Sequence, residues 1–403
     1  MTAASVDFQI SPELRADLRR WRTRAAIVGV AGAVLCAAGF LASPVAGKFQ
    51  FYRSYLWSYL FVVGLSVGSL AWLMLQYLTG GAWGVIIRRP AEAAARTLPL
   101  VLLLFIPIFI GIRNLYPWSH SNLVMADEFL RHKQPYLNVP FFAIRALIYL
   151  GGWCFLSWFF NRWSAIEDRE GGQTPRRKMG ALAGPGLIFW GLAVTFMATD
   201  WVLSIDPRWY STMYGLLMIA GQVLSSMAFL IAVIVFLAAR KPMADVVTPR
   251  HLHDLGKLMF ALVMLWAYFS FSQFLIIWAG NLPEEIPWYL VRLHGGWQYV
   301  GLLIVIGHFA LPFALLLSRD LKRNFKLLRN IALFVLLMRV VDIYWEVAPD
   351  FLKGSFGLSW MDFTAVLGLG GIWLAYFLSQ LEKRPLLPLH DPHLSEALEH
   401  GRE

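Results

Sequence analysis

The stretch from Tyr214 to Ala239 reads YGLLMIAGQVLSSMAFLIAVIVFLAA and contains no charged residue. An α-helix needs about 20 consecutive apolar residues to cross the hydrocarbon core of a bilayer, and this run is longer than that. The stretch therefore predicts a membrane-spanning helix, and it indicates the class of the whole chain.

The composition extends this prediction to the other regions. Of the 403 residues, 58% are hydrophobic and 15% are charged, and the mean hydropathy is +0.57. These values are too apolar for a soluble domain, so we expect an all-α integral membrane protein with about ten spans. The expected spans are Ala25–Leu41, Leu56–Leu78, Thr97–Ile112, Val139–Phe160, Gly180–Thr199, Tyr214–Ala239, Leu258–Ala279, Trp297–Leu317, Leu328–Trp345 and Trp360–Leu381.

A repeated feature suggests how the spans are grouped. The third and seventh spans each end in an Asn-containing turn followed by an aromatic-proline cluster, at Asn114–Trp118 and Asn281–Trp288. A repeat with a four-span offset would give two four-helix bundles, helices 2–5 and helices 6–9, flanked by helices 1 and 10. The similarity between the two segments is low.

The basic residues predict the orientation. Loops on one side of the expected topology carry most of the 35 Lys and Arg residues, about three times as many as the loops on the other side. By the positive-inside rule both termini face the cytoplasm. We therefore expect a cytoplasmic tail at 1–24, a transmembrane domain at 25–381 and a second tail at 382–403. The net charge of +10 follows from this topology and does not indicate nucleic-acid binding.

The cysteines limit the redox chemistry of the chain. Cys36 and Cys154 both lie inside apolar runs, and there is no Cys-x-x-Cys-His motif. These residues provide no set of ligands for a zinc site, an iron–sulfur cluster or a covalent haem. We expect no metal and no bound cofactor in this chain, and its own enzymatic activity stays open.

The ninth expected span carries the most charge. Arg339, Asp342 and Glu346 are spaced i, i+3 and i+7, which places them on one face of a helix. One interpretation is a salt bridge between Arg339 and Asp342, with Glu346 at the outer interface. The other is a relay that moves protons along this face, because each ionisable group at membrane depth costs about 2.5–3.5 kcal/mol and needs a partner or a function.

A histidine lies on the neighbouring eighth span. His308 is near the middle of that span, and Pro312 frees the backbone carbonyl one turn before it and permits a kink. Haem b would need a second axial histidine at the same depth, and no other expected span contains one. A structural hydrogen bond and a role in proton transfer or facing a quinone both stay open for His308.

Two further charged residues lie toward the outer ends of the fourth and fifth spans. Arg145 is expected to extend its side chain outward to the interface, in a structural role. Asp200 is expected near the outer boundary, where a carboxylate exchanges protons with water. Both are candidates for a proton path together with His308, Arg339 and Asp342.

Several strings resemble a known family. They are QYLTGGAWG at 76–84 with Arg88-Arg89-Pro90, His132-Lys133 with Tyr136-Leu137-Asn138, STMYG at 211–215, and FSQFLIIW at 271–278 with NLPEE at 281–285. Together they look like a ten-helix membrane subunit of alternative complex III, the one designated F, and the likeness runs over nearly the whole chain. The resemblance also implies two four-helix bundles.

The resemblance implies a functional setting. Alternative complex III is a quinol:cytochrome c oxidoreductase of the bacterial cytoplasmic (inner) membrane, and its F polypeptide is similar to membrane anchors of polysulfide-reductase type. The implied partners are a homologous ten-helix subunit, an iron–sulfur protein and c-type cytochromes, which hold the clusters and haem c. The homologous subunit is the better candidate for quinol oxidation, so quinol contact by this chain stays open, as does transmembrane proton translocation.

Two other functions also fit the composition. A stand-alone secondary transporter would show broken helices at matching positions in both halves, and Pro312 provides the only break expected within a span. The second is a quinone-binding membrane anchor of a molybdenum-type oxidoreductase, whose chemistry is close to that of an alternative complex III subunit.

Overall fold

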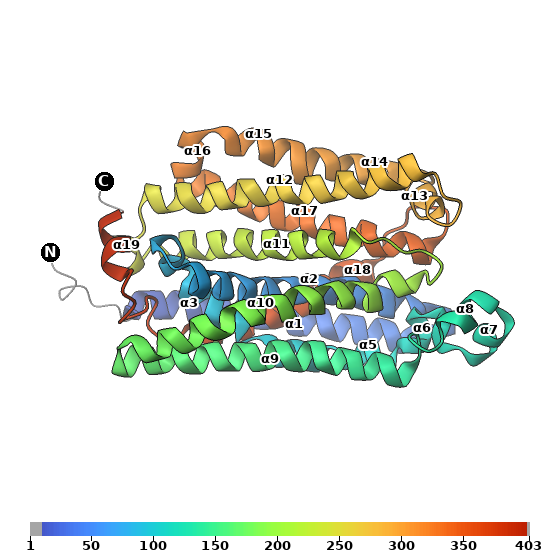
Figure 1. Cartoon of the computed structure of the whole chain (residues 1–403), viewed down its shortest axis with the longest axis horizontal. Coiled ribbons are helices and arrows are strands. Elements are labelled where there is room, and N and C mark those ends of the chain that lie inside the picture. The colour runs from blue at the N-terminus through green and yellow to red at the C-terminus, as the bar shows by residue number, and fades with distance from the viewer. Residues whose placement is uncertain (1–9, 401–403) are drawn as a thin grey trace.

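The computed structural model describes residues 10–400, and within this range the chain is built of helices and contains no strand. The long helices run side by side along one axis (Figure 1). The predicted all-α class is confirmed. The long segments are α1 (Pro12–Ala42), α2 (Val45–Thr79), α3 to α5 (Val85–Ala95, Leu98–Leu104 and Ile106–Ile110), α9 (Val139–Glu170), α10 (Gln173–Trp201), α11 (Tyr214–Leu237), α12 (Pro249–Gly280), α14 and α15 (Trp297–Ile304 and Leu311–Leu317), α17 (Phe325–Leu352) and α18 (Trp360–Leu381).

In the part of the chain that the structure describes, nine segments are long and apolar enough to cross a membrane. Helix α17 is not among them because it carries Arg339, Asp342 and Glu346. It nevertheless has 28 residues and packs along α11 and α2 through its charged face, while Leu333 and Leu337 on its other face are exposed. The chain is therefore a multi-pass membrane protein, with α17 as a further long helix packed among the apolar segments.

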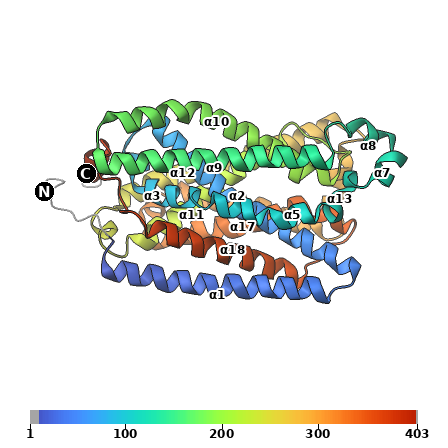
Figure 2. The ribbon, with the colours of Figure 1, turned by 90° about the horizontal axis from the view of Figure 1, so that it is seen from below.

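The helices form the two expected bundles. The first contains α2, α3 to α5, α9 and α10, and the second contains α11, α12, α14, α15 and α17. Helices α2 and α11 join the bundles, while α18 packs on α2 and α1 packs along α18 at the edge of the molecule (Figure 2). The joint is tight at Gly68, where a Cβ atom would lie 2.4 Å from the backbone oxygen of Gln222.

The two ends of the molecule differ in character. The basic end holds the start of α1 and the short helix α19 (Leu394–His400) (Figure 1). The aromatic end holds Trp118, Trp209 and Trp288. The short helices at the aromatic end are α6 (Ile112–Leu115), α7 (Ser121–Ala126), α8 (Glu128–Lys133) and α13 (Ile286–Leu293), while α16 (Arg319–Arg323) lies at the basic end.

The helices extend beyond most of the expected spans. Helix α1 begins at Pro12 instead of Ala25, because the Ser11 side chain accepts a hydrogen bond from the Leu14 N–H at 3.2 Å and caps the helix. Part of the expected N-terminal tail is thus helical. The segment after α18 also folds against the bundles, since Leu386 and Leu387 are fully buried.

The third span differs from the prediction of one helix from Thr97 to Ile112. Its apolar segment begins at Ala82, and the helix is interrupted near Phe105, two residues before Pro107. The Tyr55 hydroxyl donates a hydrogen bond to the Leu104 carbonyl oxygen at 2.8 Å, which satisfies a backbone group beside the interruption. The expectation that only Pro312 would break a span is therefore wrong.

Candidate functional site

The charged stripe on α17 lies inside the second bundle. Arg339, Asp342 and Glu346 are each at most 3% exposed. The Arg339 guanidinium donates a hydrogen bond to the Asp342 carboxylate one turn further along the same helix. The predicted pairing of these two residues is confirmed.

His308 lies near this pair in an irregular part of the eighth span. Residues Val305–Ala310 form a π-helical turn just before Pro312, so the expected local distortion is present. The His308 ring is fully buried edge-on against Trp266, with ring centroids 4.4 Å apart. Within residues 10–400, neither ring nitrogen has a hydrogen-bond partner.

Trp266 and Gly221 pack against His308 and Arg339. The Trp266 ring contacts the His308 ring, and among the described residues the indole nitrogen has no hydrogen-bond partner. On the other side, the Arg339 guanidinium packs directly on Gly221, where a Cβ atom would lie 2.3 Å from the Arg339 Cζ atom. A glycine is therefore required for Arg339 to keep this orientation toward Asp342.

Glu346, which the salt-bridge interpretation placed at the outer interface, is buried within the protein. Helix α17 continues to Leu352 and α13 covers this turn, with Arg292 donating to the Glu346 backbone oxygen at 2.7 Å. Tyr214 lies next to the Glu346 carboxylate. Among the described residues, neither the Tyr214 hydroxyl nor Glu346 Oε2 has a hydrogen-bond partner.

The stripe continues to the aromatic end through Asp350. This carboxylate receives two hydrogen bonds from Arg292, at 3.1 and 2.8 Å. It also lines a cavity of about 270 Å³, together with Arg113, His120 and Lys353. Asp350 was not predicted as a site residue, although its spacing four residues after Glu346 continues the same helix face.

Arg145 and Asp200 form a separate pair in the first bundle. Arg145 donates from Nε and Nη2 to the two Asp200 oxygens at 2.8 and 2.9 Å, and the Tyr149 hydroxyl donates to Asp200 at 2.9 Å. Arg145 also donates to the Tyr136 backbone oxygen at 2.8 Å. Asp200 is 0% exposed.

Both expectations for this pair need correction. Arg145 does not extend outward to the interface, and Asp200 does not face water, because α9 and α10 bring the two side chains together inside the bundle. Both Asp200 oxygens accept hydrogen bonds. The geometry is that of a structural ion pair, and this pair is separate from the stripe on α17.

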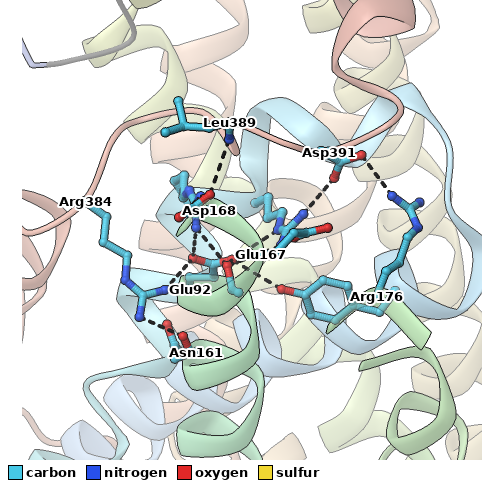
Figure 3. A network of polar contacts seen from close by, with 12 residues as sticks. Glu92, Asn161, Glu167, Asp168, Arg176, Arg384, Leu389 and Asp391 are labelled. Atoms are coloured by element: carbon cyan, nitrogen blue, oxygen red, sulfur yellow. Dashed lines mark hydrogen bonds and ion pairs between the residues drawn. The ribbon is translucent and has the colours of Figure 1, made fainter. Parts of the chain in front are cut away.

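A third polar cluster lies at the basic end and was not predicted, because Arg88 and Arg89 were expected in a loop. Both are buried in α3. Figure 3 shows the acidic residues of this cluster, Glu92 of α3 itself and Glu167, Asp168 and Asp391 of other segments. Arg88 contacts Glu92, Glu167 and Asp391, and Arg89 contacts Glu92 and Asp168. The i, i+3 and i+4 spacing of Arg88, Arg89 and Glu92 was a local signal, but the partners from α9 and from beyond α18 had none.

The segment after α18 closes this cluster. Asp391 accepts hydrogen bonds from Arg88 at 2.7 Å and from Arg176 at 3.1 Å. Burial alone would raise the pKa of Asp391, but Arg88, the His393 N–H and Arg176 together hold it below its ordinary value. The His251 ring contacts the Ala397 backbone oxygen at 2.9 Å, so the segment reaches both bundles.

A comparison with models of known protein families finds no match, and neither does a search of curated proteins. Across residues 10–400, no group of three or more His, Cys, Asp or Glu side chains is arranged to hold a metal ion.

Proposed function

We propose that this chain is an integral membrane subunit of a respiratory quinol:cytochrome c oxidoreductase of the alternative complex III type, and that its second bundle carries part of a proton path. The observation that supports the path is the buried stripe from Arg339 to Asp350. With a rise of 1.5 Å per residue the stripe is about 16 Å long, roughly half the thickness of the hydrocarbon core. It thus links the middle of the membrane to the cavity at the aromatic end.

The incomplete hydrogen bonding of buried polar atoms favours proton transfer along the stripe over a purely structural role for it. His308, Tyr214 and Glu346 each retain buried polar atoms without a partner in the described chain. Such atoms are costly to bury unless water reaches them, and neighbouring carboxylates on the stripe are about 6 Å apart along the helix axis, a spacing that water can bridge. The Arg145–Asp200 pair contains two fully engaged carboxylate oxygens and lacks this property.

The role proposed for each residue follows from its position along or beside the stripe on α17. Asp350 exchanges protons with the cavity, and Glu346 accepts or releases a proton one turn deeper. Arg339 holds the Asp342 carboxylate in place through their hydrogen bond, and His308 receives the proton beyond Asp342. Electron transfer belongs to clusters and haem c in partner subunits, including an iron–sulfur protein, c-type cytochromes and a homologous ten-helix subunit.

The assignment to this complex rests on the sequence strings that resemble its F polypeptide, together with the two bundles. Under this assignment the chain lies in a bacterial cytoplasmic membrane. The basic end, with both termini, faces the cytoplasm under the positive-inside rule, so the cavity near Asp350 opens to the opposite side. Contact with quinol is compatible with this proposal, because the resemblance extends to quinone-handling anchors.

Glu346→Gln is the sharpest test. Arg292 bonds the backbone oxygen of Glu346, so the variant keeps that contact and the side-chain volume while losing the exchangeable proton. Complex purified through a tag on this chain is expected to contain c-type haem in its absorption spectrum. In vesicles, the variant complex should assemble normally while the rate of coupled proton release falls about 100-fold.

Asp127→Asn, which changes a carboxylate that pairs with the exposed Arg208, is the matched control at the same end, and it should leave proton release unchanged. Normal proton release by an assembled Glu346→Gln complex would contradict the path. Loss of the assembled complex would instead point to a structural role for Glu346. A preparation without c-type haem would contradict the assignment to the complex and leave the path to be tested in the chain alone.

A further inference from the structure

A long groove runs along the outside of the molecule between α1, α4 and α18. Its volume is about 890 Å³, larger than the cavity of about 270 Å³ beside Asp350. Helix α1 forms one wall at the edge of the molecule, beside α18 (Figure 2). The groove is separate from the stripe on α17 and from the cluster around Arg88.

The groove changes in polarity along its length. At the basic end it is lined by Arg22, Thr23, Tyr376 and Ser379. Toward the middle of the membrane the lining becomes apolar. The apolar lining residues are Ala26, Ile27, Val30, Ala31, Val34, Leu100, Ile372 and Ala375. A matching occupant has a polar head at the basic end and a hydrocarbon chain beyond it.

The length of the groove matches one leaflet. From Arg22 to Val34 the α1 wall covers about 18 Å at 1.5 Å per residue, and half of a hydrocarbon core is about 15 Å. A lipid chain that starts at the level of Arg22 would therefore end near the bilayer midplane, at the end of the groove.

The charges at the basic end favour an anionic head group. Arg22 pairs with Glu382 at 3.0 Å, but Arg96, one turn before Leu100, donates only to neutral acceptors, the Gln380 backbone oxygen at 2.7 Å and the Asn161 side-chain oxygen at 3.1 Å. Lys383 donates to the Gln380 side chain at 3.2 Å. Arg22 is the basic residue among those that line the groove, and Arg96 and Lys383 contact Gln380, next to the lining residue Ser379. These three cations outnumber Glu382, and a phosphate would balance the excess.

We infer that this groove is a binding site for one anionic phospholipid, with its phosphate near Arg22 and Arg96 and an acyl chain along Ile27 to Val34. A quinone has a comparable apolar tail but carries no charge to balance these cations. The lipid site is independent of the proposed proton path.

Native mass spectrometry of the purified full-length protein tests the site. After washing in detergent, each copy is expected to retain one anionic phospholipid. When lipids with identical acyl chains are added back, phosphatidylglycerol should bind about 30-fold more tightly than phosphatidylcholine, because two excess basic residues each favour the anionic lipid by about 1 kcal/mol. Ala31→Phe, which fills the groove, should lose most of the retained lipid.

Val28→Phe is the matched control, because Val28 is exposed on α1 but does not line the groove. It should retain the lipid, and both variants should elute as folded protein in size-exclusion chromatography. Equal lipid retention by the two variants would overturn the site. Equal affinity for the two phospholipids, or a quinone retained in place of a phospholipid, would overturn the assignment of the occupant.

Discussion

The two bundles bury charge in different ways. In the first bundle, Arg145 and Asp200 engage each other through two hydrogen bonds, and Tyr149 supplies a third to the carboxylate. In the second bundle, Arg339 and Asp342 pair, but Glu346 and His308 keep unpartnered polar atoms among the described residues. An unpaired buried polar group costs about 1–3 kcal/mol unless water reaches it, so we expect water at these atoms of the second bundle. This difference separates a structural ion pair from a candidate transfer path.

The largest expected effect comes from breaking the pair in the first bundle. Asp200→Asn leaves the buried Arg145 without a counter-ion, which should destabilise the folded protein by about 3–5 kcal/mol. The measurement is the yield of membrane-inserted protein and its thermal unfolding midpoint in detergent. Asp127→Asn, which removes an exposed partner of Arg208, should change neither. A stable Asp200→Asn protein with impaired proton release would contradict this comparison, because it would assign a role in proton transfer to the pair in the first bundle.

A smaller effect is expected from Gly221→Ala in the second bundle. The new methyl group would collide with the Arg339 guanidinium and force it to move, at a cost of about 1–3 kcal/mol. Proton release should also fall, because Asp342 loses its aligned partner. Gly191→Ala is the control, since a Cβ atom there would meet nothing within 4 Å. If the two alanine variants have the same stability and the same proton release, Gly221 does not position Arg339.

The smallest expected effect is on the stability of the segment around Asp391 at the basic end, away from the two buried ion pairs of the bundles. The pKa of Asp391 in the folded protein lies below its ordinary value of about 3.9. Ionised Asp391 therefore contributes fully to the stability of the folded state above about pH 3.9, and this contribution is lost as the pH falls through the folded pKa. Hydrogen exchange of residues 386–397, corrected for the intrinsic rate, should be constant between about pH 8 and 5 and accelerate below about pH 4.

Asp391→Asn should raise the exchange of this segment about tenfold already at pH 7, corresponding to about 1.5 kcal/mol for the lost charged hydrogen bonds. The exchange of α11, which lies away from the cluster, provides the internal reference. Identical exchange in the two proteins at pH 7 would remove Asp391 from the contacts that hold the segment in place.

Local patterns in the sequence predicted much of the fold. The spans Trp297–Leu317 and Trp360–Leu381 match the structure at both ends, because hydropathy changes sharply there. The start of α1 at Pro12 was missed, since a polar helix that continues out of an apolar run has no hydropathy signal. Capping residues such as Ser11 were the available clue.

For the buried charges, sequence separation decided what could be predicted. Arg339 and Asp342 are three residues apart on one helix, so periodicity predicts their pairing. Arg145 and Asp200 are 55 residues apart and meet only because α9 and α10 pack side by side. No local pattern contains that information. The same reason explains why the role of Arg292 as a cover for Glu346 was not predicted.

The contact between Arg88 and Asp391 also sets an order of events during biosynthesis. Asp391 follows Arg88 by 303 residues, so at about 5–20 residues per second the ribosome supplies this partner roughly 15–60 s after Arg88 has been made. Glu92 and Glu167 arrive earlier and engage Arg88 in the meantime. The segment around Asp391, which is translated after Arg88, Glu92 and Glu167, therefore completes the cluster, and a translation product interrupted before it would leave Arg88 and Arg176 without Asp391. A protease that surveys the membrane could recognise such unfinished chains at this end of the molecule.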